Sequence, residues 1–277
     1  MGAMETRRMC PHCRAFISTR DRICPYCENE VGPRAVDRRA PAAALGGWIP
    51  HARFTTTILL LLNFGLYAAT IAAGARAGNP DPWTIDGRTL FDFGAKYRDA
   101  ILLGQWWRLV TAGFLHGGLL HILMNSWALF DLGAVVEETY GAARLIVIYF
   151  AATVTGFFAS TFWSAGLSVG ASAGIFGLIG AMIALSAQHR SPLGAAARSL
   201  YIRWAIYGLI LGLLPGLRVD NAAHIGGLVA GFGGGYLAGL PLPAVWSRRL
   251  WLAAAWGAVA LTAVSFLQMY LWLTRLR

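Results

Sequence analysis

Seven long apolar stretches constrain this chain more than any other feature of its sequence. Each is long enough, or nearly so, to cross a bilayer as a helix, which takes about 20 apolar residues. Only 13% of the 277 residues are charged, about half the roughly 25% of soluble domains. A soluble enzyme, a disordered tail and a secreted disulfide scaffold are therefore excluded, and we expect an all-α polytopic membrane protein. The stretches cover residues 54–74, 115–136, 143–163, 171–188, 200–215, 221–240 and 249–273.

A small polar head precedes the first stretch and contains every cysteine of the chain. Cys10 and Cys13 form one CxxC pair, and Cys24 and Cys27 form a second. This spacing predicts a tetrahedral four-thiolate zinc site, and a segment this small needs a structural metal to fold. Two disulfides or a redox pair are the alternatives, and they require an oxidising compartment or a βαβ context. We therefore expect a zinc ribbon over residues 1–32.

The segment at 33–53 is basic and rich in proline and glycine, which is typical of a flexible linker. No aromatic residues interleave with Arg34, Arg38 and Arg39, so no nucleic-acid partner is expected. The seven-span domain then covers residues 54–274.

The distribution of Lys and Arg predicts the orientation in the bilayer. With the N-terminus in the cytoplasm, fifteen of the 23 basic residues lie inside and eight outside, which agrees with the positive-inside rule. The cysteines then lie in reducing cytosol, where zinc is favoured over disulfides. The polar segment at 75–112, between the first two spans, lies outside and is long enough to be ordered or functional.

Polar side chains within the apolar stretches are costly and mark candidate functional sites. His121 and Asn125 are four residues apart and share one helix face. Ser172 opens the fourth span and His224 the sixth. Spans two, four and six all run inward from the outer face, so these groups and His116 lie at one depth near that face.

A serine and a histidine at one depth suggest a nucleophile activated by a general base. His121, Asn125 and the backbone N–H of Ser172 could then donate to a developing oxyanion. The alternatives are that Ser172 is helix-packing glue, that His224 is an ordinary interfacial histidine, or that the histidines bind a metal. No HExxH motif is present, and we expect Asp220 to cap its helix rather than to orient His224.

Two other classes of protein fit these residues poorly. The Gly-x-Ser-x-Gly pattern around Ser172 is typical of a hydrolase nucleophile elbow, but that motif follows a strand, and none is expected here. A transporter would have internal repeats and a site at the midplane, and the sequence indicates neither.

Over residues 54–274 the chain resembles the rhomboid intramembrane serine proteases, through motifs in the family's order. The four motifs are Trp107-Arg108, His116…His121…Asn125, Gly170-Ala-Ser172-Ala-Gly174 and Ala223-His224-Ile-Gly-Gly227-Leu-Val-Ala-Gly231. The resemblance implies a six-helix core plus one C-terminal transmembrane helix, a Ser172–His224 dyad, and His121 and Asn125 as oxyanion donors. It implies no cofactor for catalysis.

The same resemblance implies supporting roles for other residues. Trp107, Arg108, His116 and Glu137 are expected to be structural, with Phe176 packed against the catalytic histidine. Gly180 and Gly227 would let spans four and six approach closely. The span at 200–215, with about sixteen apolar residues, is expected to be the shortest and is the candidate lateral gate.

The expected activity is peptide hydrolysis in membrane-protein substrates, single-span or multi-span, near the outer face of a bacterial inner or plasma membrane. The alternative is a catalytically inactive rhomboid-like protein that binds membrane clients. Such proteins typically lack the serine or the histidine, and this chain has both.

Overall fold

The computed structural model describes residues 7–10, 12–13, 15–18, 21–31, 53–79, 81, 83–188, 191–214, 219–241 and 243–275. The chain divides into two compact units, Met1–His51 and Ala52–Arg277. All but the last residue of the predicted linker at 33–53 lies outside the described residues.

The first unit contains a two-stranded antiparallel sheet of β1 (Arg7–Met9) and β2 (Phe16–Ser18), with Arg8 opposite Ile17. Its buried cluster consists of Ile17, Val31 and two of the cysteines, Cys10 and Cys24. So few apolar side chains bury too little surface to fold a domain alone.

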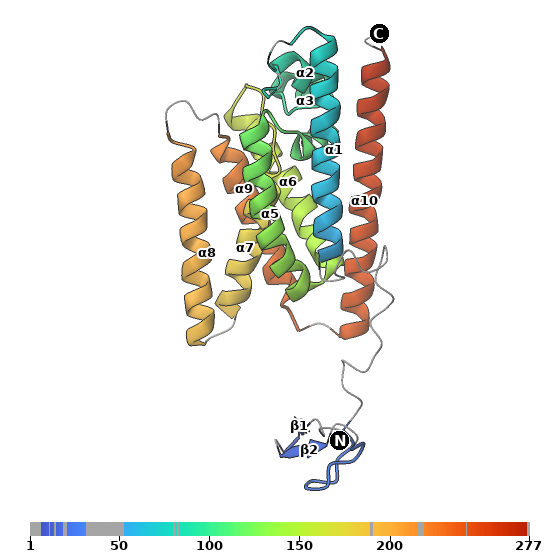
Figure 1. The fold of residues 1–277 in the computed structure, drawn as a ribbon, viewed down its shortest axis with the longest axis vertical. Helices are drawn as coiled ribbons and strands as arrows, with labels where there is room; N and C mark the ends of the chain where they lie inside the picture. Colours follow the sequence, from blue (N-terminus) through green and yellow to red (C-terminus); the bar gives the residue numbers. More distant parts are fainter. Residues whose placement is uncertain are drawn as a thin grey trace, which may run out of the picture. The chain divides into compact units, whose positions relative to one another are not determined.

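The second unit is a bundle of long helices with short helices at one end (Figure 1). All seven expected spans are helical, and the polar segment between the first two is ordered into short helices. The elements are α1 (Phe54–Arg76), α2 (Gly87–Asp92), α3 (Arg98–Leu102), α4 (Arg108–Thr111), the 3₁₀ helix η4 (Ala112–Phe114), α5 (Leu119–Tyr140), α6 (Ala142–Trp163), α7 (Ser172–Gln188), α8 (Pro192–Leu211), α9 (Asn221–Ala238) and α10 (Ala244–Arg275).

Among the described helices, four are long and apolar enough to cross a membrane by these properties alone: α1, α5, α6 and the Val245–Arg275 part of α10. Helix α7 is apolar but has only 17 residues. Helix α9 contains many glycines together with Asn221 and His224, which lower its hydropathy.

Two of the sequence expectations about the spans are wrong. The fifth span, α8, is not the shortest, because it begins at Pro192 and has 20 residues, whereas α7 has 17. The Ser191 hydroxyl caps α8 by accepting from the Gly194 amide, and Pro192 fits the first turn. Helix α5 begins at Leu119, so His116 precedes the helix and does not belong to its first turn.

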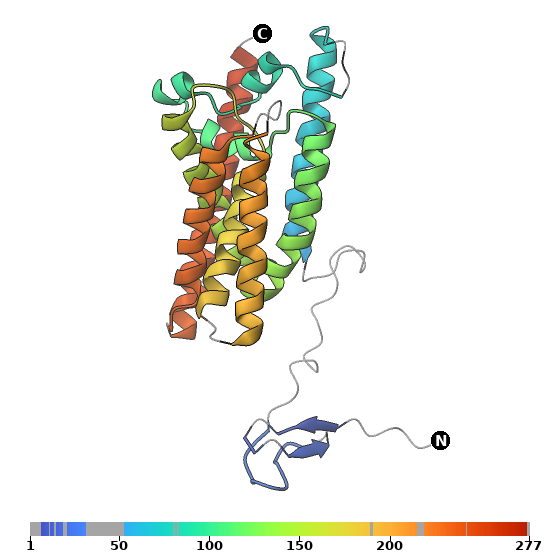
Figure 2. The same cartoon turned by 90° about the vertical axis from the view of Figure 1, so that its left-hand side faces the viewer.

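Helix α7 lies at the centre of the bundle and packs against α5, α6, α8 and α9 (Figures 1 and 2). Most of its residues are buried. Gly177, Gly227 and Gly231 lie where α7 and α9 meet, and a methyl group on any of them would overlap a neighbouring helix. Small residues at four-residue spacing thus bring the two backbones into direct contact.

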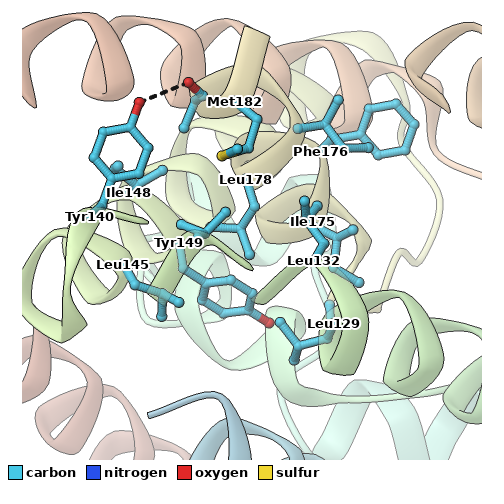
Figure 3. Packing of buried hydrophobic residues seen from close by; sticks show 14 of the residues in the cluster. Leu129, Leu132, Tyr140, Leu145, Ile148, Tyr149, Ile175, Phe176, Leu178 and Met182 are labelled. Carbon is cyan, nitrogen blue, oxygen red and sulfur yellow. Dashed lines mark hydrogen bonds between the residues drawn. The ribbon is translucent and has the colours of Figure 1, made fainter. Parts of the chain in front are cut away.

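The apolar core fills the space between α5, α6 and α7 (Figure 3). Leu129 and Leu132 of α5, Leu145 and Ile148 of α6, and Leu178 of α7 are fully or nearly fully buried there. The Tyr140 hydroxyl donates to the carbonyl of Ala181 at 2.9 Å, which ties the end of α5 to α7 (Figure 3).

The beginning of α1 is fixed to the end of α5 by one carboxylate. Glu137 is buried and accepts from the amides of Thr55 and Thr56 at 2.8 and 2.9 Å, and from the Thr56 hydroxyl at 2.8 Å. These amides belong to the first turn of α1, which has no partners inside its own helix. Helix α1 therefore begins at the end of the bundle opposite the start of α7.

Candidate active site and thiolate cluster

Ser172 and His224 lie in the first turns of α7 and α9, the two helices in closest contact. A methyl group on Gly227, one turn after His224, would overlap the carbonyl of Ala173, the residue after Ser172. Ser172 is half-buried and His224 is buried. The two side chains thus come from adjacent turns at one end of the bundle, as the sequence predicted.

An aromatic ring holds the imidazole of His224. Phe176, one turn after Ser172, stacks on His224 with ring centroids 4.0 Å apart and planes 12° from parallel. The Phe176 ring also lies close to α8. A methyl group on Gly208 of α8 would lie only 2.5 Å from Phe176 Cζ, so the ring is packed against the backbone there. The ring therefore packs against both His224 and the backbone of α8.

Asp220 caps α9 and does not orient His224. Its carboxylate accepts from the Ala223 amide at 3.0 Å and from the Ser160 hydroxyl of α6. His224 Nδ1 is buried and makes no hydrogen bond to any described residue. The expectation that Asp220 acts as a cap is confirmed.

His121 Nε2 and Ser172 Oγ both lie beside Gly170. Its Nδ1 accepts from the Gly117 amide at 3.4 Å, which leaves the proton of a neutral imidazole on Nε2. A methyl group on Gly170 would lie 2.7 Å from His121 Nε2 and 3.6 Å from Ser172 Oγ. Gly170 has φ +133°, a conformation that favours glycine. It therefore leaves space between an N–H donor and the serine hydroxyl.

Asn125 lies one turn after His121 on the same helix face, as expected. Its amide group donates to the His121 carbonyl at 2.9 Å, so one N–H of the amide is used within the helix. His116 is fully buried in the segment before α5, and its ring meets that of His121 edge to face at 5.1 Å. His116 thus packs against the ring of His121.

Comparisons with known proteins place this bundle in a family. A family model described as the rhomboid domain matches residues 103–240. RHOMBOID-like protein 5 of Arabidopsis thaliana is 34% identical over 241 residues, which cover 78% of this chain and 76% of the relative. The chain belongs to the rhomboid family.

Other relatives of this rhomboid are named as proteases. Rhomboid protease GluP of Bacillus subtilis is 39% identical over 162 residues, 58% of this chain and 32% of GluP. Rhomboid-like protease 2 of Toxoplasma gondii is 33% identical over 190 residues, 67% of this chain and 65% of the relative. The rhomboid chain thus spans about a third of GluP and just under two thirds of the Toxoplasma protein.

The Trp-Arg pair of this rhomboid lies at the end of the bundle that holds Ser172. The Arg108 guanidinium is fully buried, donates to the carbonyls of Phe91 and Ala95, and lies over the rings of Phe91 and Trp107 at 4.1 and 4.6 Å. It also lies 5.6 Å from the ring of Trp272, near the end of α10. Arg108 therefore joins the short helices to the last span.

Sequence reasoning missed two residues near the site. Ser160, near the end of the third apolar stretch and in the last turn of α6, donates to the Asp220 carboxylate across 60 positions of sequence. Lys96 is fully buried and donates to the carbonyls of Ser164 and Gly166, and burial lowers the pKa of its ammonium group. The position of Lys96 in a polar loop gave no signal of burial, whereas Ser160 carried the general signal of a polar residue in a span.

In the first unit of this rhomboid, the four cysteines form one cluster. All four Sγ atoms lie within 4.8 Å of one another, with 3.7 Å between Cys10 and Cys27 and 3.6 Å between Cys13 and Cys24. These thiols are free, and the separations exceed the roughly 2.05 Å of a disulfide. The two Sγ–Sγ distances match the distance between two ligands of a tetrahedral metal ion with metal–sulfur bonds of about 2.3 Å. The four thiolates therefore fit a metal ion.

Proposed function

We propose that this chain is an intramembrane serine endopeptidase that cleaves transmembrane segments of membrane proteins. The observation that carries the proposal is the juxtaposition at the α7–α9 contact. Ser172 and His224 open the two touching helices, and His121 Nε2 faces the space beside the serine hydroxyl. The relatives named as proteases support the same assignment.

In the proposed mechanism, His224 Nε2 takes the proton of the Ser172 hydroxyl as Oγ attacks the scissile carbonyl carbon. The protonated histidine then gives this proton to the leaving amine, which releases one product and leaves an acyl-enzyme on Ser172. Water attacks the ester with His224 again as the base, the ester C–O bond breaks, Ser172 Oγ takes the proton back from His224, and the carboxylic acid product leaves. Because Asp220 is held by Ala223 and Ser160, the mechanism uses a dyad.

The negative oxygen that forms during each attack needs hydrogen-bond donors. His121 Nε2–H, the remaining N–H of Asn125 and the amide of Ser172 are the proposed donors. The Ser172 amide lies at the beginning of α7, where the helix supplies no acceptor. Donors fixed by packing before substrate binds require no reorganisation during the reaction.

We propose that the Ser172 end of the bundle faces the outer side of a bacterial inner or plasma membrane, with the chain's N-terminus in the cytoplasm. With the N-terminus inside, fifteen of the 23 Lys and Arg residues of the chain lie on the cytoplasmic side, which supports this orientation. Water for deacylation then enters from the outer side. A helical substrate must unwind locally, since each peptide bond in a helix is shielded by its own turn, so small and helix-breaking residues are expected at the cleavage site.

We also propose that Cys10, Cys13, Cys24 and Cys27 bind one structural zinc ion. The four thiolate ligands and their separations support zinc, which prefers tetrahedral sulfur coordination in structural sites. The metal would supply folding energy to a unit with little apolar core. The hydrolytic steps above involve no cofactor.

The decisive test is cleavage of a model single-span substrate reconstituted in vesicles with the purified chain. Ser172→Ala should lower the cleavage rate by at least about 1,000-fold, because the nucleophile is lost. Ser186→Ala, in the same helix but at its other end, is the matched control and should retain the wild-type rate. Equal cleavage by wild type and Ser172→Ala would contradict the proposal. No cleavage by a folded wild type across a panel of substrates would favour an inactive, client-binding rhomboid.

A further inference from the structure

A cavity of about 450 Å³ lies at the end of the bundle opposite Ser172. It opens between the α5–α6 junction and the α9–α10 junction. Its lining includes Arg144, Ser247, Arg248, Trp251, Leu240 and Leu252. This cavity shares no residue with the proposed active site.

Arg144 lines the cavity with an unused hydrogen-bond donor. Its guanidinium donates to the Tyr140 carbonyl at 3.3 Å and to Ser247 Oγ at 3.1 Å, and it lies 5.8 Å from the ring of Trp251. Its Nε–H is buried and has no partner among the described residues. A buried donor without an acceptor is costly, so an acceptor in the cavity would be stabilising.

The backbone adds positive potential to the same place. Helix α6 begins at Ala142 in the cavity wall, and its first turn has neither a side-chain cap nor an acidic residue. The first amides of a helix have no internal acceptors and carry the positive end of its dipole. No described residue that lines the cavity is acidic, and the nearby Glu137 is already bonded to α1. Arg144, Arg248 and the N-terminus of α6 thus line one cavity, and no described acidic residue lines it with them.

We propose that this cavity binds the phosphate of an anionic phospholipid headgroup. Arginine forms paired hydrogen bonds with phosphate, and basic cavities between membrane helices are suited to anionic headgroups. A lipid is favoured over a soluble anion because Leu240, Trp251 and Leu252 line the same cavity. The cavity therefore has a charged part for the headgroup and apolar surface for the glycerol and the acyl chains.

The test is native mass spectrometry of the full chain in detergent, titrated with phosphatidylglycerol. The double variant Arg144→Gln/Arg248→Gln should bind this lipid at least about tenfold more weakly than wild type, since it removes both guanidinium groups. Arg249→Gln removes an exposed charge that does not line the cavity and should bind within twofold of wild type. Equal binding by the double variant, or an equal loss in Arg249→Gln, would overturn the proposal.

A second variant covers the case in which the double variant does not fold. Ser247→Asp retains both arginines but places a carboxylate beside Arg144, so it should also bind phosphatidylglycerol at least tenfold more weakly. Phosphatidylcholine and inorganic phosphate are the comparison ligands, and each should bind at least tenfold more weakly than phosphatidylglycerol. If either matches phosphatidylglycerol, a specific site for an anionic lipid is refuted. If Ser247→Asp folds and binds like wild type, the cavity is not the site.

Discussion

At the scale of single residues, the most informative polar groups in this bundle are those that satisfy the backbone at helix ends. Asp220 and Ser191 cap their own helices, whereas Glu137 satisfies the first turn of a different helix. A capping group supplied from another helix fixes the distance between the two helices as well as the helix end. Within the apolar core, loss of such a group leaves amides that water cannot easily reach.

Replacement of Glu137 by glutamine should therefore destabilise the membrane unit. The glutamine side chain keeps one acceptor oxygen, but its NH₂ group cannot accept from the Thr55 and Thr56 donors. At least one of these hydrogen bonds is therefore lost, which lowers the free energy of unfolding by about 1–3 kcal/mol. Thermal unfolding in detergent measures the effect as a lower Tm. Glu138→Gln, at the exposed neighbouring position, should leave the Tm unchanged. An unchanged Tm in Glu137→Gln would show that the carboxylate does not hold α1.

At the scale of elements, the contact of α7 with α9 depends on glycine. Gly227→Ala would place a methyl group against the Ala173 carbonyl, next to Ser172. The helices must then separate, with an expected stability loss of about 1–3 kcal/mol and a fall in peptidase activity of at least tenfold, because the serine and the histidine move apart. Tm and cleavage rate measure the two effects.

Gly233→Ala, in the same helix, is the matched control. A methyl group there would have no atom within 4 Å, and alanine is up to about 1 kcal/mol better than glycine in a helix. This variant should keep full activity and an equal or higher Tm. If both glycine variants behaved alike, helix propensity rather than close approach would explain the result.

The elements themselves could largely be predicted from the sequence, because apolar stretches of this length form helices in a membrane. The boundaries were less predictable. Helix α8 starts eight residues earlier than the apolar stretch, at the Ser191-Pro192 signal, and Arg198 and Arg203 lie exposed within it. Long cationic side chains on a helix surface can extend to the membrane interface, so hydropathy alone underestimates such a helix.

The rotation of each helix about its own axis could not be predicted from the sequence. The sequence predicted that Ser172, His121 and His224 lie at one depth, and in the structure α7 contacts both α5 and α9. Contacts such as that of Ser160 with Asp220 depend on how two distant helices are rotated. Periodicity gives the buried side of each helix but not its partner.

At the scale of the whole molecule, the chain joins two units whose stabilities have different origins. The membrane unit has a large apolar core, whereas the first unit has four thiolates and few apolar side chains. Removing a metal should therefore affect one unit and spare the other.

Reduced, purified protein should contain about one zinc ion per chain by elemental analysis. A chelator should make the segment 7–31 sensitive to protease while the Tm of the membrane unit stays unchanged. Cys24→Ser should lose the metal, and His12→Ala should retain it, since His12 is exposed and outside the thiolate cluster. Reduced protein without any bound metal would refute the zinc proposal.

The position of Phe176 between His224 and α8 couples the movement of α8 to the position of His224. The ring is wedged between the imidazole of His224 and the backbone of α8 at Gly208, and α8 has few buried residues of its own. If α8 moves outward to admit a substrate, Phe176 loses its contact at Gly208, and the stacking that fixes His224, the proposed base, is weakened until α8 returns or the substrate fills the gap. Under the proposed mechanism, substrate entry and proton transfer would then occur one after the other, and the open form without substrate would be inactive.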